Sequence, residues 1–273
     1  MTMSLTAAQA LAGAGIDAAE ARMLLASATG LARTRLVAYP EAILSDAHEA
    51  AFAGLAARRK DGEPIAYLLG EREFHELTLR VTPDVLIPRP ETELLVDFAQ
   101  EALPAGGAVL DLGTGSGAVA LAIRKQHPEA RVVAVDRSAA ALAVAQENAS
   151  RLALQVEFLE GDWFGPVSGR RFDLIVSNPP YIAQGDRHLA EGDVRFEPQM
   201  ALVSGVDGLD SIRTIAAAGP AHLQRGGWIA IEHGQGQDSA VRGLLLAAGL
   251  GSVSSRPDLA GIARISFGQY NPE

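Results

Sequence analysis

The chain has 273 residues, of which 48% are hydrophobic, carries a formal net charge of −10 and contains no cysteine. Its length and hydrophobic content allow a buried core, either in one large domain or in a large domain with a small companion. The absence of cysteine excludes disulfides, thiolate metal ligands and cysteine nucleophiles, and the negative charge argues against tight, sequence-independent nucleic-acid binding. Because no apolar run of about 20 residues and no secretory leader pattern is found, a cytoplasmic protein without membrane contact is expected.

Residues 1–62 are expected to form a small helical domain, because apolar residues recur three and four positions apart. The residues that repeat in this way are Met23, Leu24, Ala28, Phe52, Leu55 and Ala56. Asp17, followed three residues later by Glu20, predicts a helix start of the capping-box type, and Gly30 predicts the end of that helix. The segment 61–64 reads Asp-Gly-Glu-Pro, which no helix should cross, so the first domain boundary is placed there.

Residues 63–90 are expected to form a connector with a short hairpin, since apolar and polar residues mostly alternate there. The apolar positions are Phe74, Leu77, Leu79 and Val81. Pro90 suits the first turn of a following helix, and the helix dipole favours Glu91 and Glu93 at that end. Arg89 stands between two prolines on a stiff segment that could carry it over a neighbouring pocket, so it is a candidate substrate-binding residue.

Residues 91–273 are expected to form an α/β domain, because strand-like runs alternate with helical ones and this order is typical of a parallel sheet with crossover helices. The predicted strands are 108–111, 131–135, 156–159, 172–176 and 228–232. The predicted helices between them are 118–126, 139–151 and 212–223. One more helix follows residue 234, and the last two apolar runs, 253–255 and 262–267, could pair as a terminal hairpin.

A glycine-rich segment predicts a nucleoside-binding loop after the first strand. Asp111-Leu112-Gly113-Thr114-Gly115-Ser116-Gly117 leaves the strand and enters a helix, and its glycines permit a tight turn close to a ligand. Asp136 ends the second strand about 20 residues later, where a carboxylate can bind ribose hydroxyls. Asp162 and Trp163 follow the third strand and offer an acceptor and a flat ring for an adenine. The candidate cofactor-binding residues are Asp111, Gly113, Thr114, Gly115, Ser116, Gly117, Asp136, Asp162, Trp163 and Asn178.

Two ligands fit such a loop, a nicotinamide dinucleotide and S-adenosylmethionine. A dinucleotide loop usually reads G-x-G-x-x-G, whereas the glycines here are spaced G-x-G-x-G after an acidic residue. Asp111 is unfavourable beside a pyrophosphate and favourable beside a sulfonium cation and an amino group. The glycine pattern alone distinguishes the two ligands only in part, but Asp111 favours S-adenosylmethionine.

The tetrapeptide Asn178-Pro179-Pro180-Tyr181 follows the strand at 172–176 and therefore lies where a buried strand enters a loop. Each proline fixes its own φ angle and lacks a backbone N–H, so the Asn178 side-chain oxygen and the Pro179 carbonyl are rigidly held acceptors. Such a pair suits a planar NH2 group. Taken alone, the stretch is equally well explained as a proline-rich turn at a strand end.

Several segments together make the sequence resemble the HemK/PrmC family, whose members are N5-glutamine methyltransferases that modify the Gly-Gly-Gln motif of class-1 peptide release factors. The segments that carry this resemblance are 61–67, 72–74, 86–93, 111–117, 136, 162–164, 177–181, 192–198 and 232–234. They extend over nearly the whole chain. The tetrapeptide alone is also found in amino-methyltransferases that act on adenine in DNA, whereas its combination with the helical N-terminal unit and the segment 89–93 is specific.

The resemblance implies a Rossmann-like, seven-stranded class I S-adenosylmethionine-dependent methyltransferase sheet at 91–273 and a helical substrate-recognition domain at 1–62. It implies methyl transfer to the glutamine amide of a release factor, in support of translation termination, with S-adenosylhomocysteine as the second product and no metal. Asn178, Pro179 and Tyr181 are then the expected catalytic residues. The expected substrate contacts are Asn178, Pro179, Pro180, Tyr181 and Arg89. We expect the Asn178 oxygen and the Pro179 carbonyl to accept the two N–H bonds of the glutamine, and the loop 193–198 to be long enough for a lid.

Two other functions agree with parts of the sequence. An adenine-N6 DNA methyltransferase would have to bind a polyanion and flip a base with a protein of net charge −10 and no evident basic stretch. A non-catalytic nucleoside-binding module would leave the tetrapeptide without a purpose. Such a module would bind S-adenosylmethionine and transfer nothing to a release factor.

Overall fold

The computed structural model describes residues 5–272, which form two compact units. The two units comprise, in turn, residues 5–71 with 190–196 and residues 72–189 with 197–272. The expected connector is divided between them. Helix α5 (Ile65–Leu69) belongs to the first unit, whereas the hairpin of β1 (Glu71–Phe74) and β2 (Leu77–Arg80) lies almost wholly in the second. The two strands pair with each other in a sheet of their own.

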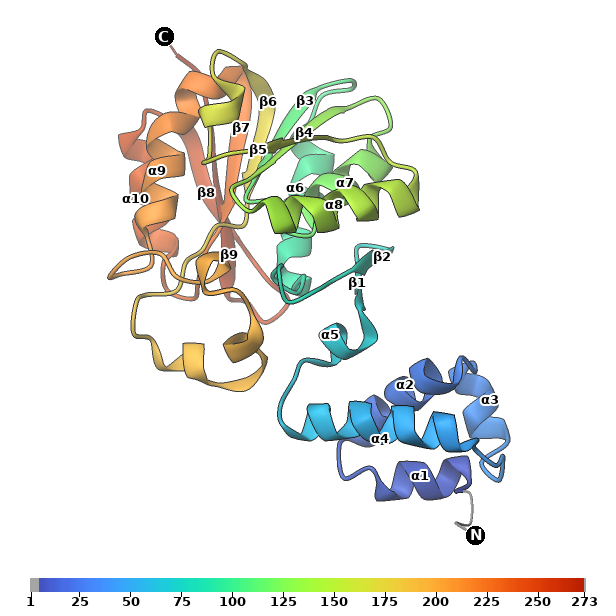
Figure 1. Cartoon of the computed structure of the whole chain (residues 1–273). Coiled ribbons are helices and arrows are strands. Elements are labelled where there is room, and N and C mark those ends of the chain that lie inside the picture. The colour runs from blue at the N-terminus through green and yellow to red at the C-terminus, as the bar shows by residue number, and fades with distance from the viewer. Residues whose placement is uncertain (1–4, 273) are drawn as a thin grey trace. The chain divides into compact units, whose positions relative to one another are not determined.

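The first unit is helical, as predicted (Figure 1). Its helices are α1 (Ala7–Gly13), α2 (Ala18–Thr29), α3 (Arg33–Ala38), α4 (Asp46–Lys60) and α5. Its core is made by apolar side chains of several helices, and Ala21, which lies one turn before Leu24 and Leu25 of α2, packs with them in one cluster with Phe52 of α4. Burial of these side chains holds together helices that are individually too short to be stable in water.

The start and end of α2 follow the sequence signals only in part. The Asp17 carboxylate accepts hydrogen bonds from the amides of Ala19 and Glu20, and Gly30 ends the helix with φ +68°. Glu20, however, does not turn back to complete a capping box. Its two oxygens accept from the Arg59 guanidinium at 2.8 and 2.9 Å. The forked, charge-assisted pair with Arg59 is stronger than a single bond from a neutral backbone amide.

The segment 190–196 belongs to the first unit although it is far from it in sequence. Asp193 lies 3.5 Å from Arg59, and the Arg195 guanidinium donates to the Asp61 carbonyl at the end of α4. Gly62 allows this approach, since a Cβ there would lie 1.9 Å from the Arg195 side chain. These contacts place the middle of the expected lid segment against the end of α4, within the helical unit.

The second unit contains a mixed sheet of seven strands in the order β5-β4-β3-β6-β7-β9-β8. The strands are β3 (Ala108–Leu112), β4 (Arg131–Asp136), β5 (Glu157–Glu160), β6 (Phe172–Ser177), β7 (Leu223–Glu232), β8 (Gly251–Pro257) and β9 (Ala263–Gln269). The first five run parallel, and β9 pairs antiparallel with β7 and β8. The predicted Rossmann-like sheet and terminal hairpin are confirmed.

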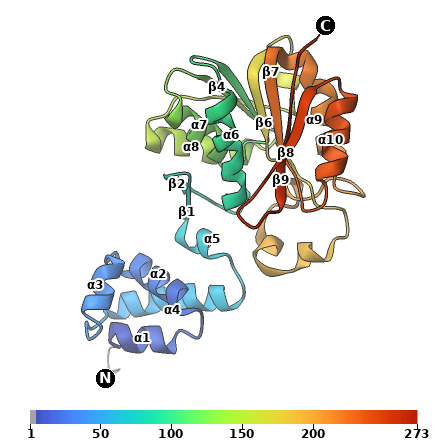
Figure 2. The same cartoon turned by 180° about the vertical axis from the view of Figure 1, so that it is seen from behind.

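Helices cover both faces of this sheet (Figure 1 and Figure 2). They are α6 (Glu93–Ala102), α7 (Ala118–Gln126) and α8 (Ala139–Leu152) on one face and α9 (Asp210–Ala218) and α10 (Asp238–Ala247) on the other. Alternate residues of β3 point to opposite faces, so Val109 joins the cluster under α6 and α7 while Leu110 joins the cluster under α9 and α10. Both faces are buried, which explains why the strands read as continuous apolar runs.

Helix α9 is shorter than the sequence predicted. It ends at Ala218, and the short 3₁₀ helix η6 (Gly219–His222) leads into β7. Pro220 explains the difference, because proline lacks a backbone N–H and its ring clashes with the preceding turn of an α-helix. Within residues 5–272, no helix has both the length and the apolar character that crossing a membrane requires.

Candidate active site

A pocket opens at the carboxyl ends of β3, β4, β5 and β6. Strands β4 and β5 extend from one side of β3, and β6 and β7 extend from the other, so the chain reverses direction across the sheet between β3 and β6. Ligands of open α/β sheets bind at such a point. The predicted site residues that line the pocket are Asp111, Gly113, Thr114, Gly115, Ser116, Asp136, Asp162, Trp163, Asn178 and Pro180.

The backbone amides of the glycine loop donate hydrogen bonds to other residues of the protein. The amides of Gly113 and Thr114 both donate to the Val135 carbonyl, at 2.9 and 3.1 Å. The amide of Gly115 donates to Asp136 at 2.8 Å. These donors are therefore not directed at a phosphate, as they would be in a dinucleotide loop. The loop offers a ligand close approach to the backbone, which suits S-adenosylmethionine better than a pyrophosphate.

Two carboxylates flank this loop. Asp111 is buried, with 1% of its surface exposed, and accepts a hydrogen bond of 2.6 Å from the Thr114 hydroxyl. Burial raises the pKa of Asp111 from 3.8 to about 7, and the nearby charge of Asp136 acts in the same direction. Asp136 is held by the amides of Gly115 and Ser138 at 2.8 and 2.9 Å. The pocket therefore favours a cationic ligand, which would stabilise both charges.

The turn after β5 places an aromatic ring next to the glycine loop. Trp163 has a φ of +44°, a strained backbone conformation for a bulky residue, and Gly161 has a φ of +154°. A Cβ on Gly161 would lie 2.5 Å from Pro166, so only glycine fits. The ring reaches to 3.8 Å from the position of a Cβ on Gly113. Asp162 is exposed at the pocket rim and lies 3.6 Å from Arg137.

Asn178 directly follows β6, and only one of the two polar atoms of its side-chain amide is hydrogen-bonded to a described residue. Its Nδ2 donates to the Thr92 hydroxyl at 3.1 Å, whereas its Oδ1 is buried and has no hydrogen-bond partner among residues 5–272. Ser177 anchors this strand end by donating to the Leu112 carbonyl at 2.7 Å. Asn178 itself is one of the residues that line the pocket.

Tyr181, at the other end of the tetrapeptide, is not among the residues that line the pocket. Its hydroxyl donates to Glu232 Oε1 at 3.2 Å. Burial and the adjacent Glu232 raise the pKa of Tyr181 above its ordinary value, so its hydroxyl stays neutral. Burial also raises the pKa of Glu232, from 4.5 to about 7. Pro179 does not line the pocket in this conformation either.

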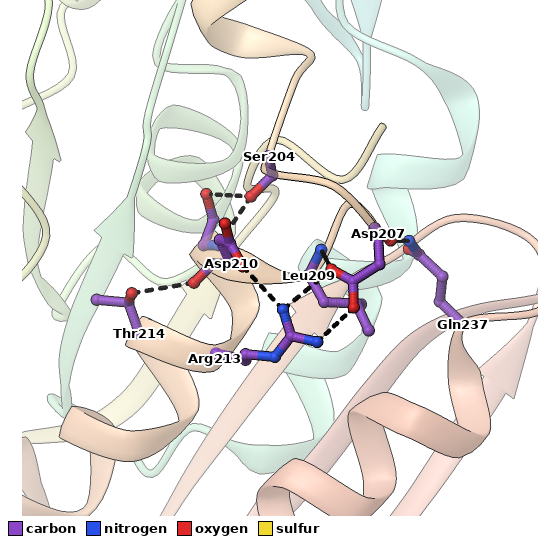
Figure 3. A network of polar contacts seen from close by, with 8 residues as sticks. Ser204, Asp207, Leu209, Asp210, Arg213, Thr214 and Gln237 are labelled. Carbon is purple, nitrogen blue, oxygen red and sulfur yellow. Dashed lines mark hydrogen bonds and ion pairs between the residues drawn. The ribbon is translucent and has the colours of Figure 1, made fainter. Parts of the chain in front are cut away.

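The loop that follows Tyr181 is fixed by a polar network (Figure 3). Gln237 donates to the Tyr181 carbonyl at 3.0 Å and to the Asp207 carbonyl at 3.4 Å. The Arg213 guanidinium pairs with the carboxylates of Asp207 and Asp210. Gly208 lies within this network with a φ of +79°, and a Cβ there would lie 2.3 Å from the Tyr181 carbonyl oxygen. The tetrapeptide is thereby held at both ends by contacts from distant parts of the sequence.

Two other predicted site residues have structural contacts instead of a place on the pocket wall. Arg89 donates to Glu197 at 2.6 Å, and the Glu197 side chain is fully buried and also accepts from the Ile87 amide at 3.0 Å. Gly117 starts α7 with φ +82° and packs against Ala145 of α8. A direct contact between Arg89 and substrate stays a prediction.

The structure also reveals pocket residues that sequence reasoning missed. They include Asp84, Val85, Leu86, Pro88, Thr92, Met200 and Ala201, whereas Pro198, which also lines the pocket, belongs to the segment expected to form a lid. Thr92 was within a segment singled out for its helix-capping charges, and the order of residues gave no sign that its hydroxyl meets Asn178. Its partner is 86 positions away in the sequence.

The seven-stranded sheet with this pocket at its switch point is compatible with a methyltransferase, and residues 90–194 match the family model of the methyltransferase small domain, which makes that class specific. Residues 5–70 match that of the PrmC N-terminal domain. The chain is 52% identical to the release factor glutamine methyltransferase of Burkholderia pseudomallei, over 97% of this chain and 96% of that protein. It is 54% identical to the enzyme of the same name from Bordetella pertussis, over 94% and 97%. The chain therefore belongs to the release factor glutamine methyltransferase family.

A solved structure shows the same fold at lower identity. It is a 16S rRNA methyltransferase of T. thermophilus in complex with AdoMet and guanosine, with a TM-score of 0.56 and 23% identity. The match covers 74% of this chain and 50% of that one. Membership of the glutamine methyltransferase family, which covers both units, does not favour an adenine-N6 DNA methyltransferase or a non-catalytic module.

Proposed function

We propose that the protein transfers a methyl group from S-adenosylmethionine to the side-chain amide nitrogen of the glutamine in the Gly-Gly-Gln motif of a class-1 peptide release factor. The names of the relatives from Burkholderia pseudomallei and Bordetella pertussis supply the substrate class. The match of residues 5–70 to the PrmC N-terminal domain supports a role of the helical unit in holding that protein substrate.

The observation that carries this proposal is the buried, unpartnered Oδ1 of Asn178. Because the Nδ2 of the same amide is engaged by Thr92, the group left for a ligand is an acceptor. Leaving a buried acceptor unpaired costs about 1–3 kcal/mol, and an N–H donor removes that cost. The NH2 group of a glutamine is such a donor.

The residues around the glycine loop fit S-adenosylmethionine. When bound, this cofactor supplies an electrophilic methyl group on a sulfonium. Asp111 supplies the buried negative charge that such a cation requires, and Asp136, held by two backbone amides, keeps lone pairs for ribose hydroxyls. Trp163 supplies a ring for the adenine.

The tetrapeptide has to orient a poor nucleophile, because the lone pair of an amide nitrogen is delocalised into its carbonyl. Asn178 Oδ1 and the Pro179 carbonyl accept the two N–H bonds of the glutamine and aim its nitrogen at the methyl group. Orientation of this kind lowers a barrier by roughly 7–11 kcal/mol in favourable cases. No strong base is needed, since the nitrogen releases its extra proton to water after transfer. Tyr181, neutral and fixed by Glu232, packs against the glutamine side chain.

The test is methyl transfer from labelled S-adenosylmethionine to three acceptors: release factor, the same factor with Gly-Gly-Gln changed to Gly-Gly-Ala, and duplex DNA. We expect label in the first alone, located on the glutamine by peptide mass spectrometry. Label in DNA would support the adenine methyltransferase instead. Binding of S-adenosylmethionine without transfer to any acceptor would support the non-catalytic module.

A further inference from the structure

Glu232 is a buried carboxyl group directly behind the tetrapeptide. It is the last residue of β7, and 1% of its surface is exposed. Its Oε1 accepts from the Tyr181 hydroxyl at 3.2 Å, and its Oε2 meets no donor within hydrogen-bond geometry in the described chain. It does not line the pocket. A carboxyl group is seldom buried so fully without a partner of opposite charge, and the mechanism above gives it no contact with substrate.

Thr92 lies between this carboxyl group and Asn178. Its side chain is buried, with 4% of its surface exposed, and its Oγ1 accepts from Asn178 Nδ2 at 3.1 Å. The Thr92 hydroxyl also lies beside the Glu232 carboxyl group and, together with Tyr181, favours its charged form. Thr92 comes from η1 (Pro90–Thr92), Asn178 from the end of β6, and Glu232 from β7, so only the fold brings the three together.

The three groups restrict one another because a hydroxyl has a single hydrogen. A charged carboxylate only accepts hydrogen bonds, so Glu232 favours the rotamer of the neighbouring Thr92 hydroxyl in which the hydrogen points toward the carboxylate. Oγ1 then has only lone pairs left for Asn178, which must present its NH2 group to Thr92. The opposite side of the same amide, Oδ1, is thereby the acceptor left for a ligand. If the group at position 232 were a donor, Thr92 could donate to Asn178, and the amide could turn over.

We propose that Glu232 is a positioning residue that fixes the orientation of the Asn178 amide through Thr92, so that an acceptor and not a donor meets the substrate NH2 group. This inference rests on the proposed function, since it concerns the amide that receives the glutamine. The amide of Asn178 would otherwise have two nearly isosteric orientations, and only one of them accepts a hydrogen bond from the substrate.

The test compares Glu232→Gln with wild type in steady-state methylation of release factor. Gln keeps the shape of Glu but adds a donor, so it permits the reversed relay. We expect kcat to fall about 100-fold, the loss typical of one preorganised polar contact to a reacting group, while KM for release factor and Kd for S-adenosylmethionine stay within about threefold. Ser255→Ala serves as a matched control, because it removes a hydroxyl bonded at 2.8 Å to Ser266, outside the pocket, and should leave kcat unchanged.

Variants of Thr92 separate the relay from a general loss of packing. Thr92→Val should lower kcat as Glu232→Gln does, and Thr92→Ser, which keeps the hydroxyl, should restore most of it. The double variant Glu232→Gln/Thr92→Val should be no slower than Thr92→Val alone, because both changes break one relay. Additive losses, or full loss in Thr92→Ser, would overturn the proposal in favour of a packing role.

The pH profile gives a readout that packing would not move. The groups facing the Glu232 carboxyl are Thr92, Tyr181, Glu91 and Arg264, and Tyr181 and Arg264 stay in one protonation state near neutral pH. Protonation turns Glu232 into a donor, so wild-type kcat, measured with S-adenosylmethionine saturating at every pH to exclude the effect of Asp111 on cofactor binding, should fall as the pH is lowered through neutrality, and Glu232→Gln should lack this step. The same step in the variant would overturn the proposal. An inactive wild type would instead contradict the proposed function, whereas an active wild type with an equally active Glu232→Gln contradicts only the relay.

Discussion

Asp111 is held in the ligand-free protein at a cost in stability, and Asp111→Asn measures that cost. Its carboxyl group is buried and its pKa is raised from 3.8 to about 7. An acid whose pKa is higher in the folded than in the unfolded state contributes stability at low pH and loses it as the pH rises through the folded value. Between pH 6 and pH 8, one such group lowers the free energy of unfolding by about 1.4 kcal/mol. Asn does not titrate, so this part of the pH dependence should disappear in the variant.

The assay is urea denaturation of wild type and Asp111→Asn at pH 6 and pH 8 without ligand. Comparing the two proteins cancels the contribution of Glu232, whose pKa is raised in the same direction. It also cancels the free-energy cost of any hydrogen bond that Asn fails to reproduce, because that cost is the same at both pH values. We expect the variant to gain about 1.4 kcal/mol relative to wild type between pH 6 and pH 8. If wild type and Asp111→Asn differed in free energy of unfolding by the same amount at both pH values, the reasoning would be refuted.

The same variant should bind S-adenosylmethionine more weakly, because the cation loses the buried charge that compensates it. In wild type, affinity should fall as the pH is lowered below about 7, since Asp111 must release a proton to pair with the cation. Calorimetric titration from pH 5.5 to pH 8 measures both effects. A pH-independent affinity in wild type would mean that the cationic groups of the ligand lie elsewhere.

Asp136→Ala should weaken S-adenosylmethionine binding by about 1.5–3 kcal/mol for each ribose hydrogen bond that is lost, measured by calorimetry; unchanged affinity would place the ribose at another strand end. Asn178→Ala should raise the barrier of methyl transfer by about 2.7–4 kcal/mol with little effect on cofactor binding, and Asn178→Asp should fall between Ala and wild type. Single-turnover transfer with both substrates saturating measures this, and a near-wild-type rate for Asn178→Ala would reduce the tetrapeptide to a structural turn. Gly208→Ala should lower both the melting temperature and turnover, because its Cβ would lie 2.3 Å from the Tyr181 carbonyl at a φ of +79°. An unaltered melting temperature there would show that the loop adjusts freely.

The features that the sequence by itself determined are those encoded by neighbouring residues. Alternation of apolar runs with helical ones predicted a parallel sheet, and strand-to-loop motifs located Asp111, Asp136 and Asn178 at its carboxyl edge. The structure places all three on one pocket. This works because parallel strands end on the same side of the sheet, so that the position of a residue within its strand is enough to place it. The same local logic predicted the Asp17 cap and the Gly30 helix end.

What only the tertiary structure decided are the partners that charged and polar groups find across large sequence distances. Glu20 follows a capping pattern but pairs with Arg59, and Arg89 pairs with the buried Glu197. The burial that raises the pKa of Asp111 and Glu232 depends on elements packed around them, not on their neighbours in sequence. Thr92, Asn178 and Glu232 come from three separate elements, and the orientation of the Asn178 amide depends on all three. Hydrogen bonds and desolvation act over a few ångströms in space, so these properties exist only once the sheet has brought the elements together.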